Sequence, residues 1–165
     1  WALGGVCRDL DTAAFLIGAL GDWLAPAWIP ASVFVMAALV SFATGTSWGT
    51  MAILFPLVVP LAHRIAPGQE VILFGTVSSI LAGSVWGDHC SPISDTTVLS
   101  SMATSCDHMD HVRTQLPYAL MVGGVSVLCA ELPVAAGWYG PWVGLLIGAA
   151  VMVGAFELLS RPVPR

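Results

Sequence analysis

Long apolar segments separated by short polar breaks make up most of this sequence. Pro30–Ala62 contains no charged residue, and Val71–Cys106 is apolar on both sides of one polar stretch, Gly83–Thr97. Leu116–Pro133 and Trp138–Leu159 are further segments of this kind. A transmembrane helix needs about 20 predominantly apolar residues. The pattern therefore predicts an all-α polytopic membrane protein with broken membrane-spanning helices.

Pro30–Ala62 is too long for one straight spanning helix, because a helix rises about 1.5 Å per residue and the hydrocarbon core is roughly 30 Å thick. A break is expected at Thr44–Thr50, which is rich in Gly, Ser and Thr. Two interpretations stay open at this point. The segment forms either a re-entrant hairpin that enters and leaves on one side or a discontinuous helix that crosses the membrane.

Arginine placement favours the hairpin by a small margin. With the C-terminus inside, a hairpin leaves Arg64 alone outside, whereas a full crossing also moves Arg8 outside; the other arginines are Arg113, Arg161 and Arg165. Cytoplasmic loops carry an excess of basic residues. The hairpin is therefore the expected arrangement.

Three shorter segments complete the expected organisation. Ala13–Leu24 is a marginal span preceded by Thr12, a residue type that caps helix N-termini. His63–Glu70 and Asp107–Arg113 are polar and are expected to be loops. Residues 1–165 are expected to form one transmembrane domain, and the apolar start at Trp1 suggests the C-terminal part of a longer protein.

The stretch Gly83–Thr97 is the main candidate for function. Irregular backbone at membrane depth persists only where it is buried in protein or lines a cavity, and carboxylates there are costly and usually functional. Asp88 is expected inside this unwound stretch. Ser91 and Pro92 are expected to cap and begin a new half-helix. Asp95 would then fall in its first turn, where an acid also simply complements the helix dipole.

The two breaks resemble each other at an offset of 38 residues. Four residues of the first break match four of the second: Ser41, Gly45, Trp48 and Gly49 correspond to Ser79, Gly83, Trp86 and Gly87. Secondary transporters place paired breaks of this kind near the substrate. We therefore expect Thr46 or Ser47 to lie close to the second break.

The side chains at the breaks supply oxygen ligands and no basic group. Such surroundings suit a hard cation. The candidate ion-binding and proton-carrying residues are Asp88, Asp95, Ser91, Ser94, Thr96, Thr46, Ser47 and His89. Serine and threonine hydroxyls also bond commonly to carbonyls of their own helix, so a single hydroxyl is weak evidence for an ion site. The evidence is the number of hydroxyls close to Asp88 in the sequence. His89 either relays protons or caps the backbone.

Composition confirms the membrane class and weakens other classes. The chain is 57% hydrophobic and 9% charged, whereas a soluble domain carries roughly 25% charged residues. The formal charge of −5 and the absence of Lys argue against nucleic-acid binding. A metalloprotein using His89, Cys90, His108 and His111 is a remote alternative, because these are residue types that bind zinc.

Three motifs carry a family resemblance. They are Thr44–Thr50, Gly87–Thr97 and Asp110–Tyr118, and together they resemble the NhaC-type sodium/proton antiporter family. The resemblance implies a secondary antiporter with re-entrant hairpins and broken helices that exchanges Na⁺ for H⁺ without a cofactor. It implies no metal beyond the transported Na⁺.

The resemblance also implies partners and a location. These are a multi-pass position in the lipid bilayer of a prokaryotic cell membrane, contacts with the N-terminal remainder of the same chain, and a possible homo-oligomer. Relatives exchange organic anions such as malate and lactate. An organic-solute exchanger coupled to Na⁺ or H⁺ is therefore the alternative function.

Overall fold

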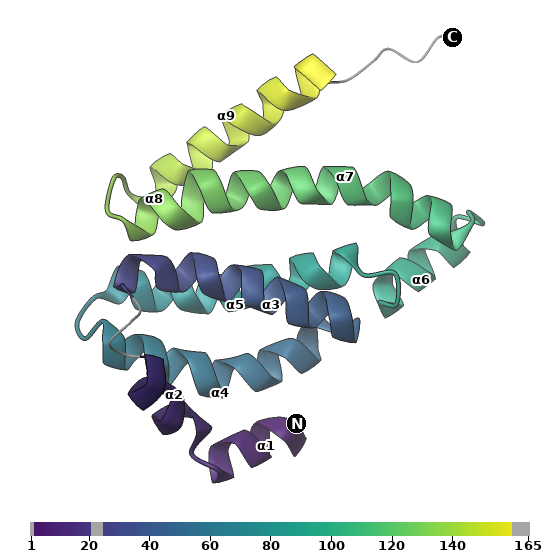
Figure 1. The fold of residues 1–165 in the computed structure, drawn as a ribbon. Helices are drawn as coiled ribbons and strands as arrows, with labels where there is room; N and C mark the ends of the chain where they lie inside the picture. Colours follow the sequence, from purple (N-terminus) through teal and green to yellow (C-terminus); the bar gives the residue numbers. More distant parts are fainter. Residues whose placement is uncertain (1, 21–24, 160–165) are drawn as a thin grey trace.

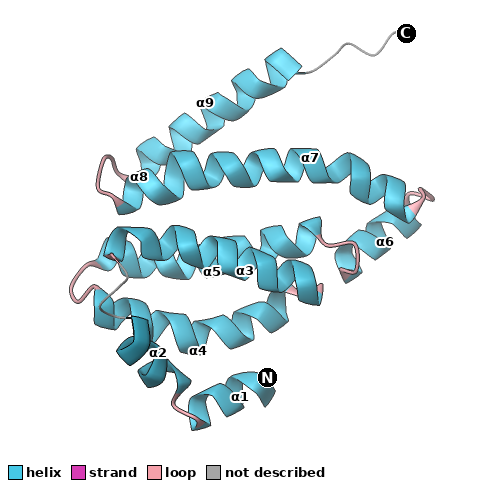
Figure 2. Cartoon of the chain, viewed as in Figure 1, coloured by secondary structure: helices cyan, strands magenta, loops and turns pink. Residues whose placement is uncertain are grey.

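The computed structural model describes residues 2–20 and 25–159, which form helices and connecting turns without a strand (Figures 1 and 2). The predicted all-α fold class is confirmed. In chain order the elements are α1 Ala2–Asp9, α2 Thr12–Leu20, a 3₁₀ turn Pro26–Trp28, α3 Ile29–Thr44, α4 Ser47–Ile65, α5 Glu70–Cys90, α6 Asp95–Ala103, α7 His108–Ser126, a π-helical turn Val127–Glu131, α8 Leu132–Ala135 and α9 Pro141–Leu159.

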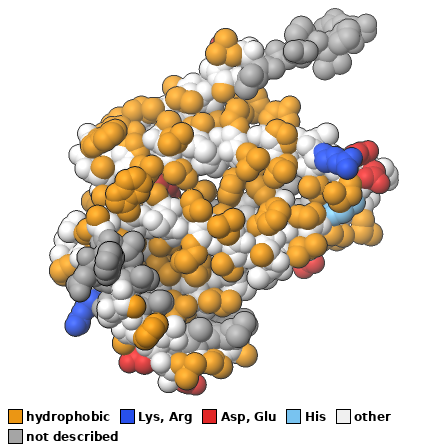
Figure 3. Space-filling view, viewed as in Figure 1, with side chains coloured by type: hydrophobic (Ala, Val, Ile, Leu, Met, Phe, Trp, Pro, Cys, Tyr) orange, Lys and Arg blue, Asp and Glu red, His pale blue; other side chains and the backbone are white. Residues whose placement is uncertain are grey.

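Five of the described helical segments are long and apolar enough to cross a membrane. They are Pro26–Thr44, Ser47–Ile65, Glu70–Cys90, His108–Ala135 and Pro141–Leu158. The marginal span predicted at Ala13–Leu24 is not among them, because α2 has only nine residues and residues 21–24 lie outside the described part. Hydrophobic side chains are spread over the face shown in Figure 3, and the few charged ones lie near its edges, as expected for a surface that contacts lipid.

α3 and α4 form the predicted hairpin. α3 ends at Thr44, and Gly45 takes the left-handed conformation (φ 66°) that a residue with a Cβ adopts only at a cost. Thr46 then caps α4, its Oγ1 accepting from the Gly49 N–H at 3.3 Å, and α4 runs back along α3 (Figure 1). The chain reverses direction at this break, which favours the hairpin over a helix that continues across the membrane. The depth of the hairpin in the bilayer stays a prediction.

α5 runs beside α3 in the same direction, and two glycines allow the close approach. A Cβ at Gly83 would overlap the Phe34 carbonyl, and one at Gly87 would overlap the Ala38 carbonyl. The core between α3, α4 and α5 is built from apolar side chains: Ile29, Val33, Ala37, Leu54, Val58, Ala62, Ile72 and Ile80.

The predicted position of the second break was wrong by several residues. α5 stays helical through Cys90, so Asp88 lies in its last turn and not in an unwound stretch. Ser91 is extended (φ −77°, ψ 129°), as expected for a residue before proline, and the break is Ser91–Ser94. Ser94, not Ser91, caps α6, which begins at Asp95 and not at Pro92. Gly83 and Gly87 misled the prediction because they serve helix packing.

The loop predicted at Asp107–Arg113 was also wrong. Asp107 caps α7, its carboxylate accepting from the N–H groups of Met109 (2.9 Å) and Asp110 (3.1 Å). The helix therefore starts at His108, well before the apolar segment. It then continues through a π-helical turn to Ala135. The predicted loop at His63–Glu70 is shorter than expected, because α4 reaches Ile65 and α5 starts at Glu70.

Candidate functional site

The two breaks lie against each other. Ser91 Oγ, in the second break, donates to the Phe42 carbonyl near the end of α3 at 2.8 Å. A Cβ at Gly45 would lie 2.9 Å from the Ile93 carbonyl oxygen, so only glycine fits this contact. The tip of the α3–α4 hairpin, with Thr46 directly after Gly45, therefore sits beside the α5–α6 break as expected.

The matching residues of the two breaks nevertheless have different structural roles. Gly45 forms a turn, whereas Gly83 packs inside a helix. Trp48 is 81% exposed, whereas Trp86 is half-buried and donates from Nε1 to the Ala119 carbonyl at 2.6 Å. The offset of 38 is therefore not a structural repeat, although it pointed correctly to two neighbouring breaks.

Asp88 is the buried carboxylate at this junction. It is 8% exposed, and its Oδ2 accepts from Thr96 Oγ1 at 3.2 Å. The Thr96 hydroxyl also lies 2.8 Å from Ser94 Oγ, and Ser94 Oγ accepts from the Thr96 N–H at 3.3 Å. The short break thus folds the first turn of α6 back onto the last turn of α5 and brings these three residues together.

Two buried hydroxyls in the same region have no hydrogen-bond partner among the described residues. They belong to Ser84 and Thr97, which are 0% and 3% exposed. Ser84 lies one turn before Asp88 on the same face of α5, and Thr97 follows Thr96 on α6. A buried polar group without a partner is rare and calls for an explanation. Here the two unpartnered hydroxyls lie on α5 and α6, the helices that carry Asp88 and Thr96.

The remaining predicted residues lie at the edge of the junction or have their side chains engaged. Asp95 is exposed at the first position of α6, Thr46 is an exposed cap, and Ser47 is half-buried at the start of α4. His89 is exposed, and its carbonyl accepts from the Gln115 side-chain amide. Ser91 Oγ also accepts from the Ile93 N–H at 3.3 Å.

Two contacts that involve ionisable residues were not expected from the sequence. His108 connects α7 to the break, with Nε2 2.6 Å from the Pro92 carbonyl oxygen and Nδ1 3.1 Å from Ser101 Oγ. Glu131 Oε2 lies 2.7 Å from Ser79 Oγ, between α5 and the π-helical turn. Glu131 is the one acidic residue in the apolar segment Leu116–Pro133, and this could have identified it as a candidate functional residue.

The proposed zinc ligands do not form a cluster. Within residues 2–20 and 25–159, no three His, Cys, Asp or Glu side chains are placed to hold one metal ion. Both ring nitrogens of His108 face protein groups instead.

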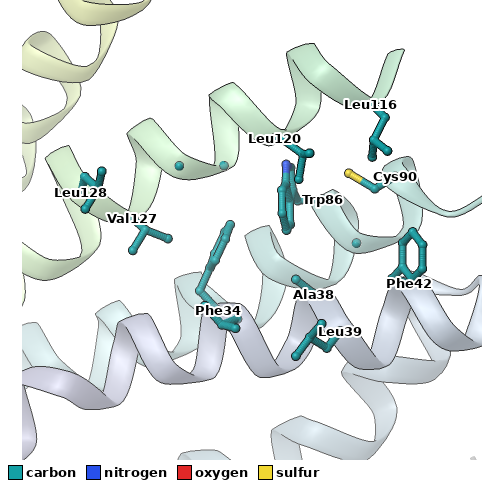
Figure 4. A pocket seen from close by; sticks show the side chains of 14 residues that line it. Phe34, Ala38, Leu39, Phe42, Trp86, Cys90, Leu116, Leu120, Val127 and Leu128 are labelled. Carbon is teal, nitrogen blue, oxygen red and sulfur yellow. The ribbon is translucent and has the colours of Figure 1, made fainter. Parts of the chain in front are cut away.

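An apolar cavity of about 610 Å³ lies on another side of α5, between α3 and α7 (Figure 4). Its wall includes Phe34, Phe42, Trp86 and Leu120, whereas Asp88 does not line it. Hydrocarbon walls cannot replace the hydration shell of an ion. The candidate ion site is therefore the polar junction and not this cavity.

The comparisons with known proteins identify the family. The profile of the Na⁺/H⁺ antiporter family matches residues 1–131. A Haemophilus influenzae protein described as uncharacterized is 42% identical over 122 residues, which is 74% of this chain and 23% of that protein. The malate-2H⁺/Na⁺-lactate antiporter of Bacillus subtilis is 34% identical over 131 residues, 68% of this chain and 27% of that protein.

A further Haemophilus influenzae protein, described as an uncharacterized Na⁺/H⁺ antiporter, is 32% identical over 110 residues, 64% of this chain and 22% of that protein. The chain thus spans about a quarter of the length of these relatives. No solved structure matches it. The family match over most of the chain agrees with the spanning helices and paired breaks, and the chain belongs to the Na⁺/H⁺ antiporter family.

Proposed function

We propose that the protein exchanges Na⁺ for H⁺ across a prokaryotic cell membrane, and that Asp88 binds the two ions alternately. The observation that supports this most is the buried Asp88 carboxylate, which accepts from Thr96 Oγ1 on α6, on the same two helices as the unpartnered hydroxyls of Ser84 and Thr97. An acid within membrane-spanning helices is a functional candidate by default, and oxygen ligands suit a hard monovalent cation.

The geometry suggests how the exchange proceeds. Ionised Asp88 attracts Na⁺, and the Thr96, Ser84 and Thr97 oxygens are available to replace part of its hydration shell. The C-terminal end of α5 adds partial negative charge from the helix dipole. Protonation of Asp88 removes the charge and releases the cation. Because both ions need the same carboxylate, each transport half-cycle carries one or the other, and the gradient of one drives movement of the other.

An organic-solute exchanger coupled to Na⁺ or H⁺ is the second candidate. It is favoured by the similarity to the Bacillus subtilis protein named for malate and lactate. An organic anion requires a basic partner, and Arg113 on α7 is the basic residue nearest in sequence to the break, although it is exposed. Competition by malate or lactate for Na⁺-dependent flux would separate the two candidates.

The first prediction tests Asp88 directly. Asp88→Asn retains the shape of the side chain but removes its charge and titration, so Na⁺-dependent proton flux should be lost. The measurement is the pH change inside proteoliposomes that contain the complete gene product carrying these residues. Asp88→Glu should retain reduced flux with an altered apparent Na⁺ affinity, because the carboxylate is kept but displaced by one methylene.

Asp95→Asn is the matched control for this substitution. It makes the same chemical change seven positions away, at an exposed residue that begins α6 and complements its dipole. Flux through Asp95→Asn should stay near that of the unaltered protein. Near-normal flux through Asp88→Asn at normal expression would exclude the carrier role, and loss of flux in both variants would assign Asp95 to the site as well.

A further inference from the structure

Glu131 is another carboxyl group, besides Asp88, that lies within a membrane-spanning segment of the chain. It ends the π-helical turn Val127–Glu131 inside the long segment His108–Ala135. π-helical turns are rare and occur frequently at functional sites. Glu131 Oε2 lies 2.7 Å from Ser79 Oγ on α5, and Ser79 is fully buried.

The hydrogen bonds of Ser79 show that this pair fits two protonation states of Glu131. Ser79 Oγ lies within bonding distance of Glu131 Oε2 and also of the Gly75 carbonyl oxygen, at 2.8 Å. A serine hydroxyl carries one hydrogen, whereas its oxygen can also accept. If Ser79 donates to Gly75, the bond to Glu131 requires a protonated Glu131 that donates to Ser79. If Glu131 is ionised, Ser79 donates to it instead.

We propose that Glu131 is a proton-binding site separate from Asp88, and that the Ser79 hydroxyl stabilises its two protonation states by reversing the direction of one hydrogen bond. Proton binding by Glu131 stands independently of the transported solute. Its participation in exchange rests on the proposed function.

Glu131 lies on the wall of a cavity and is not enclosed by helix packing on every side. A cavity of about 450 Å³ is lined by Glu131, Ser78 and Glu70, together with apolar side chains of α5, α8 and the start of α9. Glu70 is the other ionisable residue on this wall, and neither Arg nor His lines it. Tyr139, near the same end, donates its hydroxyl to the Cys129 carbonyl at 2.7 Å. A cation that would hold Glu131 permanently ionised is thus lacking on the cavity wall.

Glu131 and Asp88 lie at different depths along α5. Ser79 precedes Asp88 by nine positions, which corresponds to about 13 Å along a helix axis. Ser84, with its unpartnered hydroxyl, lies between them on the same helix. The two carboxyl groups are too far apart to share one proton directly, so they are separate binding positions at the two halves of α5.

The test is chemical labelling of the complete gene product in proteoliposomes with dicyclohexylcarbodiimide. This apolar reagent adds to a protonated carboxyl and rearranges to a stable N-acylurea, which mass spectrometry of the peptide containing residue 131 detects. We expect labelling of Glu131 at low pH, its decline as pH rises, and its absence in Glu131→Gln. The infrared carbonyl band of a protonated acid that disappears in Glu131→Gln provides the second measurement.

Two serine variants test the role of the hydroxyl. A hydrogen bond to a charged group is roughly twice as strong as one between neutral groups, so Ser79→Ala should weaken the ionised form more than the protonated form. The half-labelling pH of Glu131 should then rise by about one unit, a tenfold change in the ionisation equilibrium. Ser78→Ala changes a neighbouring serine on the same cavity wall and should leave this pH unchanged.

Each outcome is decisive. Absence of both the labelled peptide and the infrared band at every pH would overturn the proposal, and equal effects of Ser79→Ala and Ser78→Ala would remove the role of Ser79. Labelling that follows the expected pattern in a preparation without Na⁺-dependent flux would support proton binding by Glu131 while rejecting the proposed exchange. Loss of Na⁺-dependent flux in Glu131→Gln, with Asp88 intact, would show that Glu131 takes part in the exchange together with Asp88.

Discussion

At the scale of single residues, the buried hydroxyls of α5 and α6 are of two kinds. Thr76 Oγ1 donates to the Ile72 carbonyl of its own helix at 2.7 Å, and such a bond satisfies the hydroxyl without any function. Ser84 and Thr97 lack a partner among the described residues. A buried unsatisfied polar group costs about 1–3 kcal/mol. The fold carries this cost at Ser84, one turn before Asp88, and at Thr97 on α6. Coordination of a partly dehydrated ion, as proposed above, would account for it.

Thr97→Val tests whether the unpartnered hydroxyl serves ion binding. Valine retains the shape and removes only the hydroxyl, so the free energy of unfolding should stay the same or rise by up to about 1 kcal/mol. If the oxygen binds Na⁺, the Na⁺ concentration for half-maximal flux should rise about tenfold, equivalent to about 1.4 kcal/mol. The measurements are thermal unfolding in detergent and the Na⁺ dependence of proton flux.

Thr76→Val is the matched control because it makes the same change at a different buried threonine, which lies on α5. It should lower stability slightly, through loss of its bond to Ile72, and leave the Na⁺ dependence unchanged. A Thr97→Val protein with unaltered Na⁺ dependence would remove Thr97 from the ion site. A marked loss of stability in Thr97→Val would show that the hydroxyl has a partner in the folded protein.

At the scale of elements, the sequence predicted the existence of the breaks better than their boundaries. The excess length of Pro30–Ala62 required a turn, and the structure has it at Gly45. For the second break the pattern could not distinguish a glycine that ends a helix from one that permits close packing. Gly83 and Gly87 permit close packing against the α3 backbone. Their role depends on where α3 lies in the fold, and the local sequence does not contain that information.

The same limit applies to the candidate site. Asp88 and its neighbours Ser94 and Thr96 were identified because they are polar residues within an apolar segment. Their grouping with the α3–α4 hairpin was expected from the paired breaks. The contact of Glu131 with Ser79 joins residues that are 52 positions apart, and no local pattern predicts a pairing of that separation. The contact of His108 with the Pro92 carbonyl was not predicted either. The polar residues around His108 indicated a loop, whereas the structure places His108 at the start of α7.

Gly87→Ala tests the packing of α5 on α3. The added methyl would overlap the Ala38 backbone, so the helices must separate and Asp88 in the next position must move. Overpacking of this kind typically costs about 1–3 kcal/mol. We expect a lower unfolding temperature in detergent and a loss of most Na⁺-dependent flux. Gly124→Ala on α7 makes the same change where nothing lies within 4 Å, and it should be neutral.

A Gly87→Ala protein with unaltered stability and flux would show that α3 and α5 are not in close contact around Asp88. Loss of stability in both glycine variants would instead indicate a general sensitivity to helix substitution, and the specific role of Gly87 would be rejected.

At the scale of the whole molecule, the spanning helices alternate in direction and place their charges at two ends. α3 and α5 lie between α4 on one side and α7 on the other (Figure 1). Arg64 is in the last turn of α4, where the chain turns toward α5, whereas Arg113 follows the start of α7. The arrangement puts these two arginines at opposite ends, which the hairpin and the crossing interpretation both require. Arg161 and Arg165 lie outside the described residues.

This arrangement makes a specific prediction about membrane topology. Ala25, Gln69 and Trp138 are exposed and lie before α3, between α4 and α5, and after α8, whereas Cys106 is exposed between α6 and α7. With Cys106 as the only cysteine, a membrane-impermeant maleimide should label it from one face. In a cysteine-free background, Ala25→Cys, Gln69→Cys and Trp138→Cys should each be labelled from the other face.

The comparison of Ala25→Cys with Gln69→Cys carries most weight, because it depends on the hairpin alone. Labelling of these two positions from opposite faces would require α3 and α4 to cross as one discontinuous helix and would separate Gly45 from Ile93. Labelling of Cys106 and Gln69→Cys from the same face would show that α5 does not span the bilayer. Asp88 and Glu131 would then not lie at different depths. Retention of Na⁺-dependent flux by each variant provides the control that the labelled protein is folded.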